Sequence, residues 1–313
     1  MKAIIKSTCS ACATLILAMA TLTANGEPGD LFASVNGGFG NGVGSIYRYT
    51  PTGERSTFAS GLDRPRGLAF DTAGNLFVAT TFIDAIFRAT ILKFAPDGTQ
   101  SVFGRIPDSL FAQGVAIDHY DNVFVLTSHP RFRLTIIFKF TPDGERTPFA
   151  TLPKHTGEGV SQTFSQGMGL AFDSAGNLFA ADALGATIYK FTPDGTWSVF
   201  AGPEAFSDLP SGPGGLAFDS SDDLFVSTAS FPFTNDIIFK FTSSGVSNTF
   251  ATGLKMPRGL VFDDAGNLFV AEWPFDVAGS IVKIAADGTF TVFASGIGPP
   301  EGSGGPPWLA IQP

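Results

Sequence analysis

Cysteine and histidine are scarce in this chain, and their scarcity limits the chemistry that it can perform. Its 313 residues include two cysteines and three histidines. Both cysteines, Cys9 and Cys12, lie close to the N-terminus, so the rest of the chain has no disulfide framework and no thiolate nucleophile. Few side chains remain that change charge near neutral pH, which leaves few candidates for a general acid or base.

Basic residues are also few. Lysine and arginine total 19 against 28 acidic residues, and the formal net charge is -9 with a pI near 4.7. A protein that binds a nucleic-acid backbone needs a basic surface that displaces counterions from the phosphates. The composition therefore predicts no nucleic-acid partner.

A long apolar run is missing as well. The apolar stretch near the N-terminus, residues 11–20, is shorter than the roughly 20 residues that a membrane-spanning helix needs. Lys2 and Lys6 precede it and small residues follow it, which is the pattern of a secretory signal peptide. We therefore expect residues 1–24 to be a signal peptide, residues 25–313 to form a secreted or periplasmic protein, and no transmembrane anchor to be present.

Repetition is what the sequence does have. A segment that begins GLAFD at Gly67 recurs, with starts at Gly114, Gly169, Gly215 and Gly259, and the differences between these residue numbers are 47, 55, 46 and 44. The first copy contains four short runs of strand-forming residues, at residues 67–70, 76–79, 91–94 and 99–103. Four strands repeated at a period of about 40 to 50 residues are typical of the blades of a β-propeller.

Turn residues separate the runs in a way that favours antiparallel pairing. Asp-Thr-Ala-Gly-Asn at residues 71–75 joins the first run to the second, and Pro-Asp-Gly at residues 96–98 joins the third to the fourth. Aspartate hydrogen-bonds to its own turn backbone, and glycine adopts the positive φ that tight turns require. A calcium loop is the alternative for these acidic turns, but they lack the alternating oxygen ligands and the final glutamate of an EF-hand loop.

The two ends of the chain complement each other. Residues 29–59 contain a second, a third and a fourth run but no first run, whereas residues 308–311 offer a first run with nothing after it. If residues 308–311 pair with residues 31–33, the ring closes and this sheet edge disappears. We therefore predict an all-β fold: a single six-bladed β-propeller of four-stranded antiparallel blades, spanning residues 25–313 and closed by the C-terminal strand pairing with the N-terminal blade.

The aromatic composition predicts how the blades pack. Phenylalanine occurs 33 times and tyrosine four times. We expect the faces of adjacent blades to pack dry against each other, because a tyrosine hydroxyl there would lack a hydrogen-bond partner.

The repeated pattern resembles that of known propellers. It reads GLAFD, then GNLFVA, then a third run that ends in Lys-Phe before Asp-Gly. It resembles the NHL-repeat propellers and the six-bladed superfamily of gluconolactonase-like and senescence-marker-like proteins, and it is more weakly similar to the streptogramin (virginiamycin B) lyases. The resemblance covers about residues 29–311 and implies a six-bladed propeller whose ligands bind at the mouth of the central channel.

The same resemblance implies possible chemistry. Gluconolactonase-like proteins hold a divalent cation in the channel with carboxylate and asparagine oxygens, and their pattern includes Glu-Gly-Pro before one first strand. Here Glu301 precedes a glycine, but residues 303–307 separate it from the closing strand, so it does not match that pattern. Lyase-like chemistry would need histidine at the mouth. Of the three histidines, His119 belongs to a turn at the opposite end and His155 to a long loop, which leaves His129 after a second strand.

Antiparallel alternation shows which residues share the mouth. The loop that enters each first strand and the loop that leaves each second strand must lie at the same end of the ring. The residues before the first strands are Arg66, Gln113, Met168, Gly214, Arg258 and Pro307. The residues that leave the second strands are Val35, Thr80, Thr127, Asp182, Thr228 and Glu272.

From these positions we predict a set of ligand-binding residues, with no catalytic residue or metal ligand assigned: Arg66, Gln113, His129, Asp182, Arg258, Glu272 and Trp273. Arg66 and Arg258 each follow a proline and belong to the blades on either side of the closing blade. Together with the polar members of the set they would suit a small anionic or hydroxylated ligand. The alternative is that the arginines form ordinary ion pairs with carboxylates such as Glu272.

Large apolar residues also follow several second strands. They are Phe39, Phe82, Phe87, Phe132, Phe231, Phe233, Trp273 and Phe275. A contiguous apolar rim would mark a binding surface. The alternative is that these rings fold back and cap the blades.

Two functional hypotheses follow from the sequence. The first is an exported propeller that binds a small molecule, glycan, peptide or protein at the mouth of its channel, without clear catalytic residues and without a cofactor. The second is a metal-dependent lactonase, esterase or lyase. It would hold a divalent cation, calcium or similar, with Asp182 and Glu272 as oxygen ligands, assisted by Arg66, Arg258 or His129. The sequence leaves the oligomeric state open.

Overall fold

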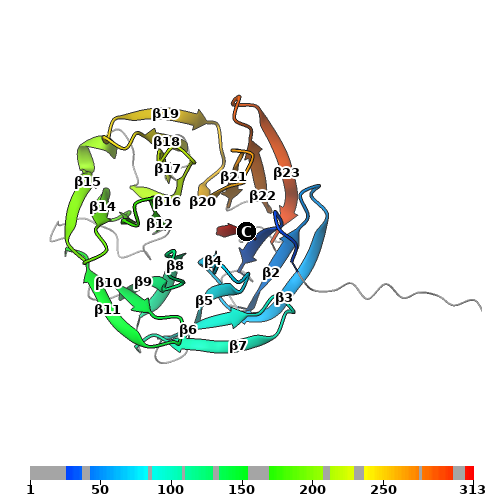
Figure 1. Ribbon diagram of the computed structural model, residues 1–313. Coiled ribbons are helices and arrows are strands. Elements are labelled where there is room, and N and C mark those ends of the chain that lie inside the picture. The colour runs from blue at the N-terminus through cyan, green and yellow to red at the C-terminus, as the bar shows by residue number, and fades with distance from the viewer. Residues whose placement is uncertain are drawn as a thin grey trace, which may run out of the picture.

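The computed structural model describes residues 26–36, 43–83, 87–107, 110–129, 134–153, 169–206, 212–228, 236–274, 277–298 and 307–313. Within these ranges the chain forms six four-stranded antiparallel sheets arranged as blades of a ring (Figure 1). The predicted six-bladed β-propeller is therefore confirmed. The expected signal peptide, residues 1–24, lies outside the described residues.

The strands follow one another in the order that the repeats predict. Blade 1 contains β24 (Trp308–Ile311), β1 (Leu31–Val35), β2 (Val43–Tyr49) and β3 (Arg55–Asp63). Blade 2 contains β4 (Leu68–Phe70), β5 (Leu76–Ile83), β6 (Phe87–Phe94) and β7 (Gln100–Arg105). Blade 3 contains β8 (Phe111–Ile117), β9 (Val123–His129), β10 (Leu134–Phe140) and β11 (Arg146–Thr151).

The second half of the ring repeats the arrangement. Blade 4 contains β12 (Leu170–Phe172), β13 (Leu178–Asp182), β14 (Thr187–Phe191) and β15 (Trp197–Ala201), followed by the 3-10 helix η1 (Pro203–Phe206). Blade 5 contains β16 (Pro213–Phe218), β17 (Leu224–Thr228), β18 (Ile237–Phe241) and β19 (Ser247–Thr252). Blade 6 contains β20 (Pro257–Phe262), β21 (Leu268–Glu272), β22 (Gly279–Ile284) and β23 (Phe290–Ile297). No helix in the described part of the chain is long and apolar enough to cross a membrane.

The ring is closed by the two ends of the chain, as predicted. Strand β24 pairs antiparallel with β1, with Leu31 opposite Ile311 and Ser34 opposite Trp308. The C-terminal end of the chain lies near the centre of the ring in Figure 1, because β24 is the innermost strand of blade 1. This pairing removes the sheet edge that β1 would otherwise expose.

Phenylalanine rings fill the spaces between blades. The ring of Phe32 meets that of Phe58 in its own blade and that of Phe70 in blade 2, in each case edge to face with centroids 5.0 Å apart. The same arrangement recurs around Phe124, Phe179 and Phe225. Each hydrophobic cluster joins two adjacent blades, so burial of these rings holds the blades together.

The glycine that begins each GLAFD segment allows the innermost strands to approach closely. Gly67 donates its backbone N–H to the Gln113 carbonyl of the next blade, at 2.9 Å. A Cβ atom at Gly67 would lie 2.4 Å from that same oxygen. Gly169 and Gly259 make the equivalent bonds to Gly214 and Pro307, each at 3.0 Å. These bonds join neighbouring blades around the axis at the end of the ring where the first strands begin.

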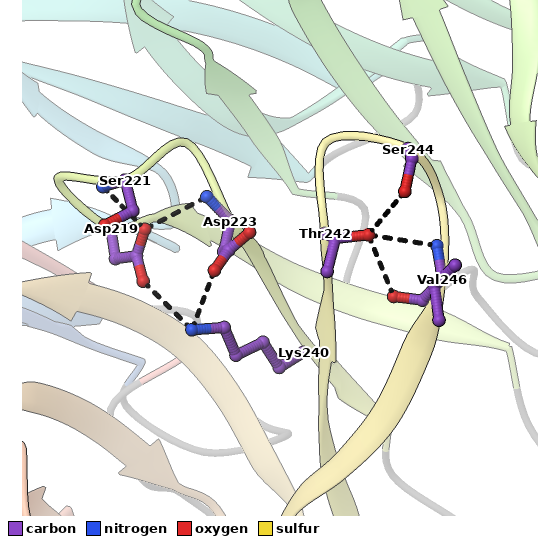
Figure 2. Close-up of polar contacts among 7 residues, drawn as sticks. All are labelled: Asp219, Ser221, Asp223, Lys240, Thr242, Ser244 and Val246. Atoms are coloured by element: carbon purple, nitrogen blue, oxygen red, sulfur yellow. Dashed lines mark hydrogen bonds and ion pairs between the residues drawn. The ribbon is translucent and has the colours of Figure 1, made fainter.

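The acidic turns lie at the opposite end of the ring and bind lysines of their own blades. In blade 5, Lys240 Nζ lies 3.4 Å from Asp219 Oδ2 and 2.8 Å from Asp223 Oδ2 (Figure 2). Asp219 Oδ1 also accepts the backbone N–H groups of Ser221 and Asp223. In the neighbouring turn of Figure 2, Thr242 Oγ1 accepts the N–H of Val246 at 3.2 Å. The oxygens of these turns therefore bind their own backbone and the blade's lysine, as the turn interpretation predicts.

Candidate functional site

We call the mouth the end of the ring where first strands begin and second strands end. The backbone shows that these two kinds of position lie side by side. Arg66, which precedes β4, donates its N–H to the carbonyl of Ala79 in β5 at 2.9 Å. In blade 6, Pro257 and Glu272 are direct partners in the pairing of β20 with β21. The predicted mouth residues therefore lie at one end of the ring.

The threonines that end second strands serve their own blades. Thr80, Thr127 and Thr228 are buried, and each donates its hydroxyl to a backbone carbonyl of the third strand. The distances are 3.0, 2.9 and 3.2 Å, in the same order. The hydroxyls of these side chains therefore donate their hydrogen bonds within the blade rather than to a ligand.

The two predicted acids at this position are also engaged within the fold. Asp182 Oδ1 accepts the backbone N–H groups of Leu184 and Gly185, each at 3.1 Å, which caps the turn that follows β13. Glu272 Oε1 accepts the N–H of Lys255 at 2.7 Å, and its Oε2 accepts the hydroxyl of Ser280 at 2.5 Å. No group of three or more acidic, histidine or cysteine side chains in the described ranges is arranged to hold a metal ion.

Arg66 is held by an amide rather than by an acid. Its Nη1 donates to Gln113 Oε1 at 3.0 Å, and Gln113 Nε2 in turn donates to Ser128 Oγ at 3.1 Å. Gln113 is 3% exposed, so this chain of hydrogen bonds fixes the guanidinium from within. Within the described residues no ion pair joins Arg66 to a carboxylate.

The electrostatic environment of Arg66 disfavours its positive charge. Burial, with a smaller contribution from the charge of Arg64, lowers the pKa of Arg66 to about 10. The residue as a whole keeps an intermediate exposure to solvent, so its loss of hydration is partial and the side chain still reaches the surface. A cation in this state favours a negatively charged neighbour.

Arg258 lies near enough to Arg66 for their charges to interact. Burial and the charge of Arg66 lower the pKa of Arg258, the charge of Asp236 opposes them, and the resulting pKa is about 10. The Arg258 guanidinium carbon lies 5.9 Å from the centre of the Trp273 ring, within reach of a cation–π contact. The alternative that the arginines pair with carboxylates such as Glu272 stays open for Arg258, on which the charge of Asp236 acts, while the Glu272 carboxylate accepts hydrogen bonds from Lys255 and Ser280.

Asp236 is a residue that the sequence interpretation missed. It is 5% exposed and lies directly before β18. Third strands also begin at the mouth, so the same alternation that selected Arg66 would have selected Asp236. Its Oδ2 accepts the backbone N–H of Met256 at 2.8 Å, which brings a carboxylate from blade 5 to the segment that precedes Arg258.

Strained backbone precedes both arginines. Arg64 has a φ of 42° and Met256 a φ of 51°, and each is followed by proline and then by Arg66 or Arg258. Positive φ is unfavourable for a residue with a Cβ and occurs often at functional sites. Two buried carboxylates stabilise the backbone around Met256. Asp236 accepts the N–H of Met256, and Glu272 accepts the N–H of Lys255. These acids therefore position Arg258.

Several buried polar atoms in blades 1 and 6 lack a partner among the described residues. They are Ser34 Oγ and Asn36 Oδ1 in blade 1, which lies between the two arginines, and Trp273 Nε1 in blade 6. Asn36 occupies in blade 1 the position that Ser128 occupies in blade 3, one residue beyond the end of the second-strand pattern. Buried polar atoms are nearly always hydrogen-bonded, so this group is compatible with a ligand that supplies the missing partners.

The remaining predicted residues have mixed outcomes. His129 ends β9, pairs across the strand with Leu134 and follows Ser128, so it lies at the mouth as expected. Phe82 is exposed, and the guanidinium carbon of Arg88 lies 5.2 Å from the centre of its ring. The rest of the predicted apolar rim other than Trp273, namely Phe39, Phe132, Phe231, Phe233, Phe275 and the side chain of Phe87, lies outside the described residues, as do Met168, His155 and Glu301.

Comparison with known proteins supports the fold. No family model and no curated protein matches the chain. Virginiamycin B lyase from Staphylococcus aureus has a similar structure, with a TM-score of 0.52 and 17% identity over 76% of this chain and 71% of that chain. A gluconolactonase from Xanthomonas campestris gives a TM-score of 0.52 and 16% identity over 89% of this chain and 90% of that chain. A protein of unknown function from Bacteroides caccae gives a TM-score of 0.57 and 14% identity over 92% of this chain and 100% of that chain.

At these identities the similarity shows a shared fold and does not test for a shared activity. The predicted resemblance to gluconolactonase-like proteins and streptogramin lyases is confirmed at the level of the six-bladed propeller. The resemblance to NHL repeats stays a prediction.

Proposed function

We propose that this chain is an exported β-propeller that binds a small anionic ligand at its mouth, between Arg66 and Arg258, and that it acts as a binding protein rather than an enzyme. The observation that carries the proposal is the state of Arg66. Its guanidinium is desolvated, it is held by the neutral side chain of Gln113, and no carboxylate in the described residues forms an ion pair with it.

A desolvated cation is costly for a folded protein unless an opposite charge lies beside it. Arg66 and Arg258 raise this cost together, since the charge of one lowers the pKa of the other. An anion placed between them would relieve both the lost hydration and the mutual repulsion. The two side chains come from equivalent positions on blades 2 and 6, whose innermost strands both contact β24 of blade 1.

Export is part of the proposal and depends on residues 1–24, with their basic start and apolar core. An exported binding protein needs no cofactor to perform this function. The observed roles of Asp182 and Glu272, which bind backbone N–H groups, support a structural role for both acids.

Thermal unfolding in the presence of anions tests the proposal. We expect the melting temperature of the purified protein to rise with phosphate, sulfate or a carboxylate, and not with a neutral sugar, in a buffer of about 0.15 M salt that screens weak surface binding. A ligand at a hundred times its Kd stabilises the folded state by about 2.7 kcal/mol. If none of these anions raises the melting temperature, the proposal fails.

Two variants and a matched control locate the effect. Arg66→Met and Arg258→Met should each abolish the anion-dependent rise, whereas Arg105→Gln, on the exposed outermost strand β7, should keep it. The lowered pKa of Arg66 means that its charged form costs stability at every pH below about 10, and this cost disappears only as the pH rises above that value. Arg66→Met removes this cost together with the hydrogen bond to Gln113 Oε1, so a melt of the unliganded variant serves as the folding control. An equal rise in wild type and both mouth variants would refute the site.

A further inference from the structure

Aromatic contacts link the outermost strands of neighbouring blades around most of the ring. A phenylalanine in the fourth strand of one blade meets an aromatic ring in the third strand of the next, as Phe200 of β15 meets Phe241 of β18 with ring centroids 5.9 Å apart. The equivalent contacts join Phe58 to Phe94, Phe103 to Phe140, Phe149 to Phe191, and Phe293 to Tyr49. Within the described residues, the boundary between blades 5 and 6 is the one that has no such contact.

The boundary between blades 5 and 6 is more open at the rim for two reasons. Ile284 of β22 takes the place of the aromatic ring in the cluster against which Phe250 of β19 packs. The turn before β23 also keeps its distance, since a Cβ at Gly288 would have no described atom within 4 Å. A Cβ at the equivalent Gly144 or Gly245 would lie 3.3 or 3.7 Å from a phenylalanine carbonyl oxygen of the preceding blade. The outer edge of β19 is therefore less covered than the other edges.

Arginines protect two of the other outer edges. Arg55 of blade 1 donates to the Gly296 carbonyl of β23 at 3.4 Å, and Arg146 of blade 3 donates to the Arg105 carbonyl of β7. Phe290 has the equivalent position in blade 6, beside β19. A phenylalanine has no hydrogen to donate, so it cannot protect the carbonyl groups of β19 in this way.

The segment around β19 is neutral and partly apolar. Residues 242–252 contain no acidic residue, lysine or arginine, and Ser244 replaces the aspartate of the Asp-Gly turns. Its hydroxyl lies 2.9 Å from that of Thr242 (Figure 2). Each of the other fourth strands has an acid in the turn before it: Glu54, Asp97, Asp143, Asp194 and Asp287. The exposed apolar residues here are Val246, Phe290 and Val292, which are 61%, 46% and 68% exposed.

We propose that a second copy of this chain binds at this edge, with its own β19 pairing antiparallel to the first. Two identical edge strands can pair about a two-fold axis, and each supplies the backbone donors and acceptors that the other needs. The chain has a net charge of -9, so two copies repel each other least where the meeting segments are uncharged. Val246, Phe290 and Val292 flank the paired strands and lose water on association. This contact does not depend on the anion site at the mouth.

The size of the contact predicts a weak dimer. Strand β19 has six residues, Ser247–Thr252, and three apolar side chains beside it form an interface at or below about 800 Å² per copy, which is typical of transient complexes. Sedimentation equilibrium of the purified chain should therefore show mainly monomer near 1 µM and mainly dimer at about 200 µM, as a micromolar Kd requires. Added salt should tighten the dimer, because it screens the repulsion between two acidic copies.

Two variants at the rim, each with a matched control on blade 2, locate the contact. Phe290→Arg introduces the protective arginine and Val292→Lys introduces a charge, so each should weaken the dimer by about tenfold or more. Gln100→Arg and Val102→Lys make the same changes at the equivalent positions of β7 and should leave the dimer unchanged. Thermal melts at about 1 µM, where the chain is monomeric, show whether each variant folds like the wild type.

Amide hydrogen exchange identifies the strand that pairs. The amides of residues 247–252 should exchange more slowly at about 200 µM than at about 1 µM, whereas those of residues 100–105 should not change. A wild type that stays monomeric at every concentration overturns the proposal, and so does a dimer that both rim variants leave intact. A monomer whose β19 amides exchange slowly at every concentration would show instead that another segment of the same chain covers this edge.

Discussion

Arg66 Nη1 donates to Gln113 Oε1 across the boundary between blades 2 and 3, at 3.0 Å. The acceptor of this bond is a neutral amide, whereas an ion pair would require a carboxylate. The amide fixes the direction of the guanidinium without neutralising its charge, and this combination makes the mouth suitable for an anion that arrives from solution.

Gln113→Glu tests that relationship directly. The new carboxylate would supply the missing counter-charge, so Arg66 should bind it instead of a ligand, and anion affinity should fall by roughly tenfold or more. Gln113→Leu is the matched control without charge, and it should lower the free energy of unfolding by about 1–3 kcal/mol because Arg66 and Ser128 lose a buried partner. Calorimetry and urea unfolding measure the two effects. Undiminished anion affinity in Gln113→Glu would contradict the role given to Arg66.

The recurring glycines should be intolerant of a methyl group for steric reasons. Gly67→Ala would place a Cβ 2.4 Å from the Gln113 carbonyl and should destabilise the protein by about 1–3 kcal/mol through overpacking. Gly266→Ala separates this effect from backbone strain, since Gly266 has a φ of 77° and no atom within 4 Å of an added Cβ; it should cost about 1–2 kcal/mol. Chemical denaturation measures both. Only Gly67→Ala should also weaken anion binding, because it displaces Gln113.

The turns at the end opposite the mouth should make the protein sensitive to acid. The Asp222 carboxylate accepts the hydroxyl and the N–H of Ser174 in the preceding blade, and these bonds lower the pKa of Asp222 below its usual 3.8. A group with a lowered folded-state pKa contributes stability that is complete above about pH 4 and is lost as the pH falls through the folded-state value.

Asp222→Asn should therefore lose less stability than the wild type between pH 7 and pH 3, although its free energy of unfolding at pH 7 should be lower than that of the wild type. Urea unfolding at each pH measures this, and a double variant with Ser174→Ala shows whether the two residues act together. An acid profile identical to that of the wild type would mean that the bond between blades 4 and 5 does not contribute.

Removal of divalent metal should leave the protein unchanged if it is a binding protein. We expect a chelator to alter neither the melting temperature nor the anion affinity, and a panel of lactones and esters to show no turnover. Stoichiometric bound metal, with turnover that is lost in Glu272→Gln and kept in Ser280→Ala, would instead establish the metal-dependent hydrolase or lyase. Ser280 is the matched control because it binds the same Glu272 carboxylate from within the blade.

The fold was predictable from the sequence because each blade repeats its own turn chemistry. Gly67 and its equivalents, together with the Asp-Gly turns, impose the same local structure at each repeat, and the missing first strand before Leu31 required the C-terminal strand to close the ring. The mouth was predictable in part. Alternation along antiparallel strands placed Arg66 and Arg258 at one end, but it carries no information about which loop atoms a side chain meets.

The partners of the acids therefore could not be derived. Glu272 binds the N–H of Lys255 and Asp182 the N–H groups of its own turn, contacts that depend on loop conformations without a repeating pattern. Asp236 was missed for a different reason, since it directly precedes a third strand, β18, and the expected mouth set covered only first and second strands. The strain at Arg64 and Met256 has no sequence signal beyond the proline that follows each of them.

The central claim is that one anion site lies between Arg66 and Arg258, and a crystal soaked with selenate tests it most directly. Selenate is a tetrahedral dianion whose selenium gives an anomalous signal, so its position is observed independently of any assay. The account predicts its strongest anomalous peak within hydrogen-bonding distance of both guanidinium groups, and no such peak in Arg66→Met. An empty mouth, or a stronger peak at an exposed arginine such as Arg105, would contradict it.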